Sequence, residues 1–243
     1  MKNLLKNFNL SVALACVVAV PGLFVPAESA QAKGTASEKS SAPIDENLEE
    51  LDLVEMINSV PLDSESADLI RKYQEKIGRQ YLYEKHYNNK TASNVETYRN
   101  KEVLLVTIPA SALFAPNAVD VSRDAKKMLD PLKPFLKDPD MFRVLVVMHT
   151  DNTGSQRYRD ELTEDRSTAI YDWFADQGLD TSYLFPFALG DDQPLVINNS
   201  MNNREKNRRL EVYIIPGKKL LEYAKKGEPV LKKYINSIIP GLR

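Results

Sequence analysis

The sequence predicts an α/β fold, a β-α-β-α-β sandwich of one mixed sheet against helices, with a helical extension before it and a helical tail after it. Two observations lead to this prediction. Strand-like and helix-like patterns alternate between residues 95 and 216. The segment from Phe142 to Met148 is almost continuously apolar, as in a strand covered on both faces. With 243 residues, 43% of them hydrophobic, the chain is long enough for one compact domain with appendages.

Residues 1–32 have the pattern of a signal peptide. Two lysines precede an apolar stretch from Leu10 to about Val25, and small residues lead up to Ala32, after which we expect cleavage. Cys16 is the only cysteine and lies inside this segment, so the mature protein would have no cysteine chemistry. A lipid anchor at Cys16 is the alternative. Either way, we expect an exported protein.

Residues 33–62 are predicted to be a flexible linker, because they begin with a stretch rich in serine, lysine and acidic residues that lacks apolar periodicity. Only residues 48–57 carry a weak helix pattern. A helical extension is predicted over residues 63–94, where an apolar stripe recurs in steps of four residues. The stripe consists of Leu69, Tyr73, Ile77 and Tyr81. It is typical of a helix that packs on a neighbouring domain, and a binding face is the alternative.

The domain predicted over residues 95–216 has seven elements, with a tight turn in its first hairpin. We expect strands at residues 95–98 and 103–108 around a turn at Asn100-Lys101, a helix at about 122–135, a strand at 142–148, a helix at about 156–177, an extended segment at 185–189 and a last strand at 209–214. Pro131 and Pro134 must bend or divide the first helix.

Residues 217–243 are predicted to be a basic amphipathic helical tail. From Lys218 onward the tail has six lysines and one arginine against two glutamates, and its apolar residues have helical spacing. Gly227 can end one helix, and Pro229 can begin the next. We expect the apolar side to pack on the domain with the lysines in solvent. Binding to anionic lipid or to an acidic partner is the alternative.

The composition argues against nucleic-acid binding and against catalysis. The formal net charge is −2 and the isoelectric point is about 5.9, so no global positive field attracts a nucleic acid. His86 and His149 are the only histidines, and no His-Glu-x-x-His or Gly-x-Ser-x-Gly motif occurs. We therefore expect no enzyme, no cofactor and no metal site, and we expect His149 to be a structural residue.

The end of the strand at residues 142–148 carries a candidate binding site. Asp151 follows this strand, and Arg166 lies four residues from both Leu162 and Ile170, on or beside the apolar face of the next helix. A guanidinium holds a carboxylate with two parallel hydrogen bonds, and an aspartate holds an ammonium. The two residues therefore suit an amino-acid zwitterion. The alternative is that Asp151 and Arg166 pair with each other.

Several linked motifs follow one another in the second half of the chain. They are His149-Thr150-Asp151 with Gly154-Ser155, then Tyr158, Leu162-Thr163 and Arg166, then Gly190 with Gln193-Pro194, and finally Asn207-Arg208-Arg209-Leu210-Glu211. In order and spacing they resemble the OmpA-like C-terminal domain, a family that binds peptidoglycan. The resemblance covers about residues 102–216. It implies a periplasmic protein associated with the cell wall and the outer membrane.

The resemblance also implies a ligand, the diaminopimelate residue of the peptidoglycan stem peptide. The distal carbon of this residue carries both an ammonium and a carboxylate. By resemblance, Asp151 takes the ammonium and Arg166 takes the carboxylate, with backbone amides near Thr153 and Gly154 assisting. We therefore expect non-covalent binding that tethers the protein or the outer envelope to the wall.

Three further arginines lie near these motifs. Arg159 stands where the family usually has an asparagine that contacts the ligand, and Arg208 is a candidate for reaching the sugar or the peptide. Arg209 follows it on a strand whose sides alternate, so we expect Arg209 to be a structural anchor. In the alternative function, the domain is a scaffold for periplasmic assembly, and the extension and the tail bind a protein partner or a membrane.

Overall fold

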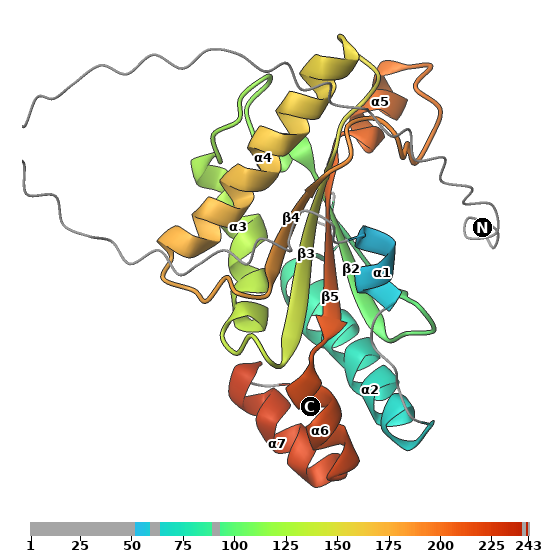
Figure 1. The fold of residues 1–243 in the computed structure, drawn as a ribbon, viewed down its shortest axis with the longest axis vertical. Coiled ribbons are helices and arrows are strands. Elements are labelled where there is room, and N and C mark those ends of the chain that lie inside the picture. The colour runs from blue at the N-terminus through green and yellow to red at the C-terminus, as the bar shows by residue number, and fades with distance from the viewer. Residues whose placement is uncertain (1–51, 59–63, 89–92, 240–241, 243) are drawn as a thin grey trace, which may run out of the picture. The chain divides into compact units, whose positions relative to one another are not determined.

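A computed structural model describes residues 52–58, 64–88, 93–239 and 242 of the chain (Figure 1). All of them belong to one compact unit, Glu46–Arg243. The predicted signal peptide at residues 1–32 lies outside the described residues, as does most of the predicted linker at residues 33–62. None of the described helices is both long enough and apolar enough to cross a membrane.

The described part of the chain begins with helices and then alternates between strands and helices. The N-terminal helices are α1 (Leu53–Asn58), α2 (Ser64–Lys76) and the π-helix η2 (Ile77–His86). They are followed by β1 (Asn94–Tyr98), β2 (Val103–Pro109), the 3-10 helices η3 (Ala110–Ala112) and η4 (Arg123–Ala125), α3 (Lys126–Leu129), the 3-10 helix η5 (Asp130–Leu136), β3 (Phe142–His149), α4 (Gln156–Asp176), β4 (Leu184–Ala188), α5 (Met201–Asn207), β5 (Arg209–Pro216), α6 (Lys218–Lys225) and α7 (Glu228–Ile238).

The strands form one mixed sheet, as the sequence predicts. Their order is β1-β2-β5-β3-β4, in which β3 and β4 run parallel and each other neighbouring pair is antiparallel. β5 is the central strand and is buried along its whole length, because it has a neighbour on each side and side chains over both faces. The predicted strands are confirmed to within about two residues at their ends.

A tight turn joins β1 to β2 at the predicted position. Arg99, Asn100 and Lys101 have φ angles of 47°, 52° and 69°, in the left-handed region that asparagine tolerates better than most residues. Arg99 also donates a hydrogen bond of 2.8 Å to the carbonyl oxygen of Ile57. The turn is therefore tied to α1.

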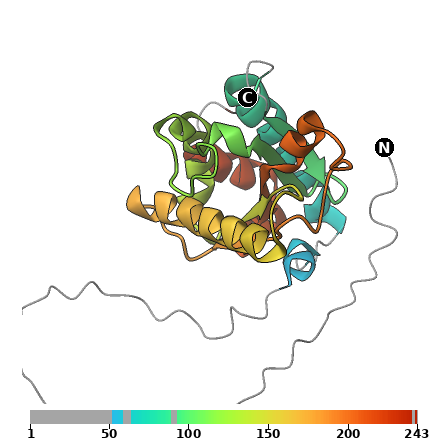
Figure 2. The same cartoon turned by 90° about the horizontal axis from the view of Figure 1, so that it is seen from above.

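The larger core lies on the face of the sheet that receives side chains from α2, α4, α6 and α7. Viewed from above, α2 and α4 lie on opposite sides of the domain (Figure 2).

The helix predicted at residues 122–135 is divided into η4, α3 and η5. Pro131 and Pro134 explain the division, because each removes a backbone donor from the second half of the segment.

The helical extension packs into this core. Tyr73, Ile77 and Tyr81 of the predicted stripe are buried. Gly78 lies so close to β2 that a β-carbon there would come within 2.7 Å of the Leu104 side chain. The stripe is therefore a packing face, and the alternative of an exposed binding face is wrong. No pattern in the sequence indicated the π-helical geometry of η2.

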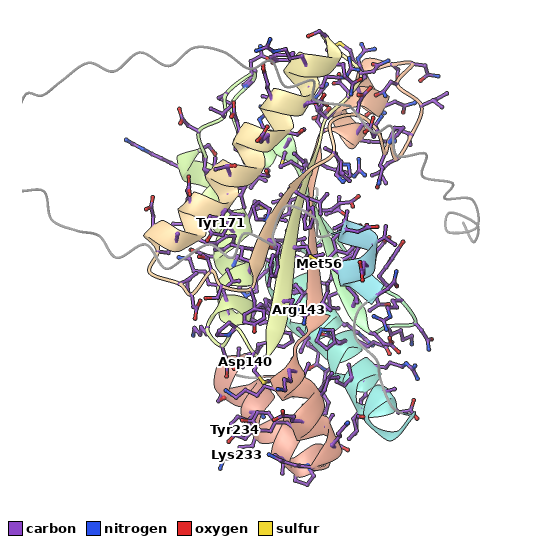
Figure 3. All side chains as sticks on the ribbon, in the orientation of Figure 1. Met56, Asp140, Arg143, Tyr171, Lys233 and Tyr234 are labelled. Atoms are coloured by element: carbon purple, nitrogen blue, oxygen red, sulfur yellow. The ribbon has the colours of Figure 1, made fainter. Side chains whose placement is uncertain are left out.

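The opposite face of the sheet carries a smaller core beneath α1 (Figure 3). Met56 and Ile57 of α1 are buried in one cluster with side chains of β2, β3 and β5. The prediction of a flexible linker is therefore wrong for residues 53–58, because these apolar side chains gain free energy by leaving water for the sheet. The weak helix pattern at residues 48–57 marks the same place.

The tail forms a helical hairpin whose apolar side completes the larger core. Leu231 and Ile235 are fully buried, as the packing prediction requires. Gly227, with a φ of 95°, makes the turn between α6 and α7. Gly217 joins the hairpin to β5 at a point where a β-carbon would collide with the carbonyl oxygen of Asp140.

Candidate functional site

The loop after β3 holds Asp151 at the end of the sheet. The backbone N–H of Thr150 donates a hydrogen bond of 2.8 Å to the carbonyl oxygen of Gly190, which fixes the chain where the strand ends. Asp151 is 2% exposed. Its Oδ1 accepts a hydrogen bond of 2.7 Å from the backbone N–H of Thr153. The carboxylate is thus buried and oriented by its own loop.

Arg208 supplies the charge that pairs with Asp151. Its Nη1 donates to Oδ2 of the aspartate, and its side chain is 38% exposed. Burial alone raises the pKa of Asp151, but the hydrogen bonds from Thr153 and Arg208 outweigh it and hold the pKa below its ordinary value. Asp151 is therefore ionised at neutral pH, and its charged partner lies on the solvent side.

Asn207 positions Arg208 between the end of α5 and the start of β5. Its side chain is fully buried. Its Nδ2 donates a hydrogen bond of 2.7 Å to the carbonyl oxygen of Val196, and its Oδ1 accepts one of 3.1 Å from the backbone N–H of the same residue. The loop before α5 is therefore fixed to the point where the chain enters β5.

Arg166 lies on the buried side of α4 and is 5% exposed. Its Nε donates a hydrogen bond of 2.9 Å to the carbonyl oxygen of Ala118. Its guanidinium carbon lies 4.7 Å from the centre of the Phe114 ring. Within the residues that the structure describes, neither of its Nη groups has a hydrogen-bond partner, and no carboxylate lies within ion-pair distance.

The charge of Arg166 is therefore not neutralised by its surroundings. Burial lowers its pKa below the ordinary value; the neighbouring Tyr158 acts against this effect, and the nearby Arg208 adds to it. Because a guanidinium stays protonated in proteins, the buried positive charge persists. Asp151 pairs with Arg208 rather than with Arg166, so the mutual pair considered from the sequence is not formed.

Arg159 stabilises the loop that leads into α4 through hydrogen bonds. Its Nε donates a hydrogen bond of 2.6 Å to Asp191, its Nη1 one of 2.7 Å to the carbonyl oxygen of Gly154, and its Nη2 one of 2.9 Å to Gln156. Gly154 has a φ of 89°, and a β-carbon there would come within 2.8 Å of the Tyr158 ring. The loop therefore requires glycine at this position.

A second buried arginine, next to the site on β5, has a protein partner for each of its three nitrogens. Arg209 is 3% exposed and donates hydrogen bonds of 2.7 Å to Glu211 and of 3.1 and 3.2 Å to two backbone carbonyl oxygens. Glu211 also accepts a hydrogen bond of 2.7 Å from the hydroxyl of Tyr213. His149 is buried, with its Nε2 3.4 Å from the same carboxylate. Arg209 thus has the structural surroundings expected from the sequence, whereas the two ring nitrogens of the buried His149 have no hydrogen-bond partner among the described residues.

The structure brings some of the predicted site residues together and separates others. Asp151, the backbone of Thr153 and Arg208 form one cluster, and Arg208 lies near Arg166. Gly154 contacts Arg159 instead. Thr153 and Gly154 are exposed, but the backbone N–H of Thr153 already donates to Asp151, so this amide is occupied by the protein.

The groups that hold Arg166 were missed in the sequence. Phe114 and the carbonyl oxygen of Ala118 lie far from it in the chain, and a backbone acceptor leaves no signal in a sequence. Asp191, the partner of Arg159, lies 32 residues away from it in the chain.

This arrangement can bind a ligand that carries both charges. The Nη groups of Arg166 suit a carboxylate, and Asp151 suits an ammonium that shares or replaces the contact with Arg208. Among the described residues, no three His, Cys, Asp or Glu side chains gather in a way that could hold a metal ion.

Comparison with known proteins confirms the resemblance stated from the motifs. Residues 113–208 match the model of the OmpA family. The chain is 23% identical over 114 residues to outer membrane protein A of Bordetella avium, which covers 47% of this chain and 59% of that protein. It is 27% identical over 96 residues to the peptidoglycan-associated lipoprotein of Haemophilus influenzae, which covers 40% of this chain and 63% of that protein. The chain thus spans about three fifths of the length of these curated relatives.

The fold has a counterpart among solved structures. A MotB-like protein from Desulfovibrio vulgaris superimposes with a TM-score of 0.54 at 23% sequence identity, over 62% of this chain and 95% of that one. This likeness concerns the fold alone. It confirms the predicted sandwich of one mixed sheet against helices.

Proposed function

We propose that the OmpA-family domain at residues 113–208 lets this chain bind peptidoglycan non-covalently, through the diaminopimelate residue of the stem peptide. The proposal rests on the surroundings of Arg166. A buried guanidinium with two unpartnered Nη groups and no counter-ion costs free energy unless a ligand completes it. A carboxylate from outside the protein supplies what is missing.

The second charge of the ligand fits Asp151. An ammonium beside this carboxylate takes over or shares the contact that Arg208 makes, and Arg208 is exposed enough to move towards solvent. The backbone N–H of Thr153 orients this carboxylate, and Gly154 lies on the exposed loop beside it. A group that bears an ammonium and a carboxylate on one carbon therefore finds a partner for each charge, as the distal end of diaminopimelate does.

The names of the relatives support the same proposal. One relative is called a peptidoglycan-associated lipoprotein and another an outer membrane protein. We propose that this chain likewise is exported and is held at the cell wall near the outer membrane, and that it binds the wall without cleaving it.

Co-sedimentation with purified peptidoglycan tests the proposal. Asp151→Ala and Arg166→Ala each leave one ligand charge unpaired, at a cost of about 2 to 5 kcal/mol of binding free energy, so we expect both variants to stay in the supernatant. Arg166→Lys keeps the positive charge but cannot form two parallel hydrogen bonds. We expect it to bind much more weakly than the wild type.

Arg157→Ala is the matched control. Arg157 lies on the same helix, is largely exposed and pairs only with Glu161 within the described residues, so its removal should leave sedimentation unchanged. Binding that survives in both the Asp151 and the Arg166 variants contradicts the proposal. Release of soluble wall fragments by the wild type would instead indicate an enzyme.

A further inference from the structure

We propose that the α6–α7 hairpin, residues 218–239, binds the surface of an anionic phospholipid membrane. This inference goes beyond the proposed wall binding and does not depend on it. It rests on the charge of the hairpin, on what its apolar side already contacts, and on the end of the domain at which it lies.

The hairpin concentrates positive charge on a protein that is acidic overall. Residues 218–239 contain six lysines and two glutamates, a net charge of +4, whereas the whole chain has a net charge of −2. The exposed lysines are Lys218, Lys225, Lys226, Lys232 and Lys233. One of the glutamates, Glu228, is already paired with Lys72 of α2. A local field of this sign attracts polyanions despite the negative net charge.

Four of these lysines have no carboxylate partner in the part of the chain that the structure describes. Lys218, Lys226, Lys232 and Lys233 form no ion pair there, whereas Lys219 is paired with Asp138. Lys226 lies over the Tyr223 ring, 5.3 Å from its centre. The side chain of Lys233 projects from α7 beside Tyr234 (Figure 3). Their charges are therefore available to an external partner.

The apolar side of the hairpin determines how it can bind. Leu220, Leu231, Ile235 and Ile238 are buried in the larger core. An amphipathic helix that inserts into a membrane does so with its apolar face, and here that face cannot reach lipid without unfolding the domain. Binding must therefore be electrostatic, at the level of the lipid headgroups, and must weaken as salt is added.

The chemistry of the surface favours a membrane over an acidic protein. Every basic residue of the hairpin is a lysine. A lysine ammonium acts as a mobile point charge, whereas an arginine guanidinium can bind one carboxylate with two parallel hydrogen bonds. All of residues 218–239 are described, and among them Tyr234 is the only large hydrophobic residue that is exposed, with an exposed fraction of 38%. A protein interface needs a central apolar anchor in a pocket, whereas lysines beside a tyrosine suit a headgroup layer. Tyr234 stacks on Tyr223 with ring centres 3.8 Å apart, which holds it in place.

The hairpin lies at the opposite end of β5 from the candidate wall site. Arg208 precedes the first residue of this strand, and Gly217 follows its last residue (Figure 1). A strand of this length spans roughly 25 Å. The domain can therefore contact the wall at one end while the lysines of the other end face a membrane.

Vesicle flotation tests the proposal with residues 33–243, the chain that remains after the predicted signal peptide is removed, which lacks the apolar N-terminal stretch. We expect the protein to float with vesicles of phosphatidylglycerol mixed equally with phosphatidylcholine, and to stay at the bottom with phosphatidylcholine alone. Raising the salt from about 0.1 M to about 1 M shortens the Debye length from about 10 Å to about 3 Å and should release the protein.

Charge variants locate the binding surface. The triple variant Lys226→Gln, Lys232→Gln and Lys233→Gln should bind anionic vesicles at least about tenfold more weakly, since each lysine near an anionic surface contributes separately. The arginine version of the same triple variant should restore binding, because it restores the charge. Both should still sediment with peptidoglycan.

A control variant removes the same number of charges elsewhere. Lys85, Lys127 and Lys206 are exposed and lie outside the hairpin, so their replacement by glutamine should change vesicle binding by less than about twofold. Equal losses in the two glutamine variants would mean non-specific attraction and would overturn the proposal. So would flotation with phosphatidylcholine alone, or no flotation at all. Lysine-dependent binding to polyglutamate without vesicle binding would assign the surface to an acidic protein instead.

Discussion

Two buried arginines of the same domain have opposite surroundings. Arg209 is 3% exposed and is held by the carboxylate of Glu211 and by two backbone carbonyl oxygens. Arg166 is 5% exposed, yet its described partners are one carbonyl oxygen and the face of a phenylalanine ring. The two residues cannot be distinguished by burial or by charge.

The difference shows what separates a structural charge from a receptor. The protein itself supplies the counter-ion of Arg209, so nothing remains for a ligand to do there. Arg166 is held in position by its Nε and its ring contact, while its two Nη groups stay available. A buried cation that is oriented but not neutralised is suited to recognise an anion.

Replacing each arginine by alanine should give the largest contrast between the two regions. Arg209→Ala leaves Glu211 buried without its guanidinium, and we expect it to lower the free energy of unfolding by about 3 to 5 kcal/mol. Arg166→Ala removes one hydrogen bond but also a buried charge without a counter-ion, so we expect a loss of no more than about 1 kcal/mol. Chemical unfolding followed by circular dichroism measures both. Equal losses would mean that Arg166 has a structural role, and the comparison would fail.

The acid stability of the protein should depend on Glu211. Burial alone raises the pKa of its carboxyl group, but the nearby His149, whose Nε2 lies 3.4 Å away, together with Arg209 and Tyr213, outweighs it and lowers the pKa to about 2 from an ordinary value of 4.5. Between these two values the unfolded chain takes up the proton first, so stability falls as the pH falls. The contribution is up to about 3 kcal/mol, fully present above about pH 5 and lost by about pH 2.

Glu211→Gln should remove this dependence. We expect the variant to be less stable at neutral pH and to show a flatter decline between about pH 5 and pH 2 than the wild type. Unfolding titrations at several pH values provide the measurement. A decline as steep as that of the wild type would assign the acid sensitivity to other carboxylates or to His149, whose pKa is lowered by burial.

Ligand selectivity tests whether Arg166 recognises a carboxylate of the ligand. Lysine keeps the distal ammonium of diaminopimelate and lacks its distal carboxylate, so a lysine-containing stem peptide leaves Arg166 unpaired. We expect diaminopimelate muropeptides to bind at least about tenfold more tightly than lysine muropeptides, which corresponds to about 1.4 kcal/mol. Calorimetric titration of matched muropeptides decides this. Equal affinities would show that Arg166 does not read the carboxylate.

The smallest effect is expected at Arg159. Its three donor groups are occupied by protein acceptors, so it resembles Arg209 more than Arg166. Arg159→Asn introduces the residue that the family usually has, and we expect muropeptide affinity to change by less than about threefold, or roughly 0.6 kcal/mol. A larger loss in the same titration would place Arg159 among the ligand contacts.

The sheet could be predicted because its signals are local. Strand patterns and turn residues such as Asn100 depend on short stretches of sequence, and they located the strands correctly. α1 and α5 carried too little local signal. A six-residue helix such as α1 is not stable alone. It forms because Met56 and Ile57 pack on the face of the sheet opposite the larger core.

The partners of the site residues could not be predicted in the same way. The motifs identified Asp151 and Arg166, but the choice of ion pair depends on the register of β3 and β5. His149 lies opposite Arg209 in that register, and this places Arg208 near Asp151. Since register is set by the packing of whole strands, a short motif does not contain it.

The central position of β5 has a mechanical consequence. If the wall holds Asp151 and Arg166, beside the Arg208 end of this strand, and a membrane holds the hairpin that follows Gly217, tension between the two runs roughly along the strand. Its hydrogen bonds to β2 and β3 are perpendicular to its length, so a pull along the strand loads both ladders in shear, and many bonds must break together. An edge strand pulled sideways would open one bond at a time. The strand order β1-β2-β5-β3-β4 therefore places the line of force where the sheet resists it best.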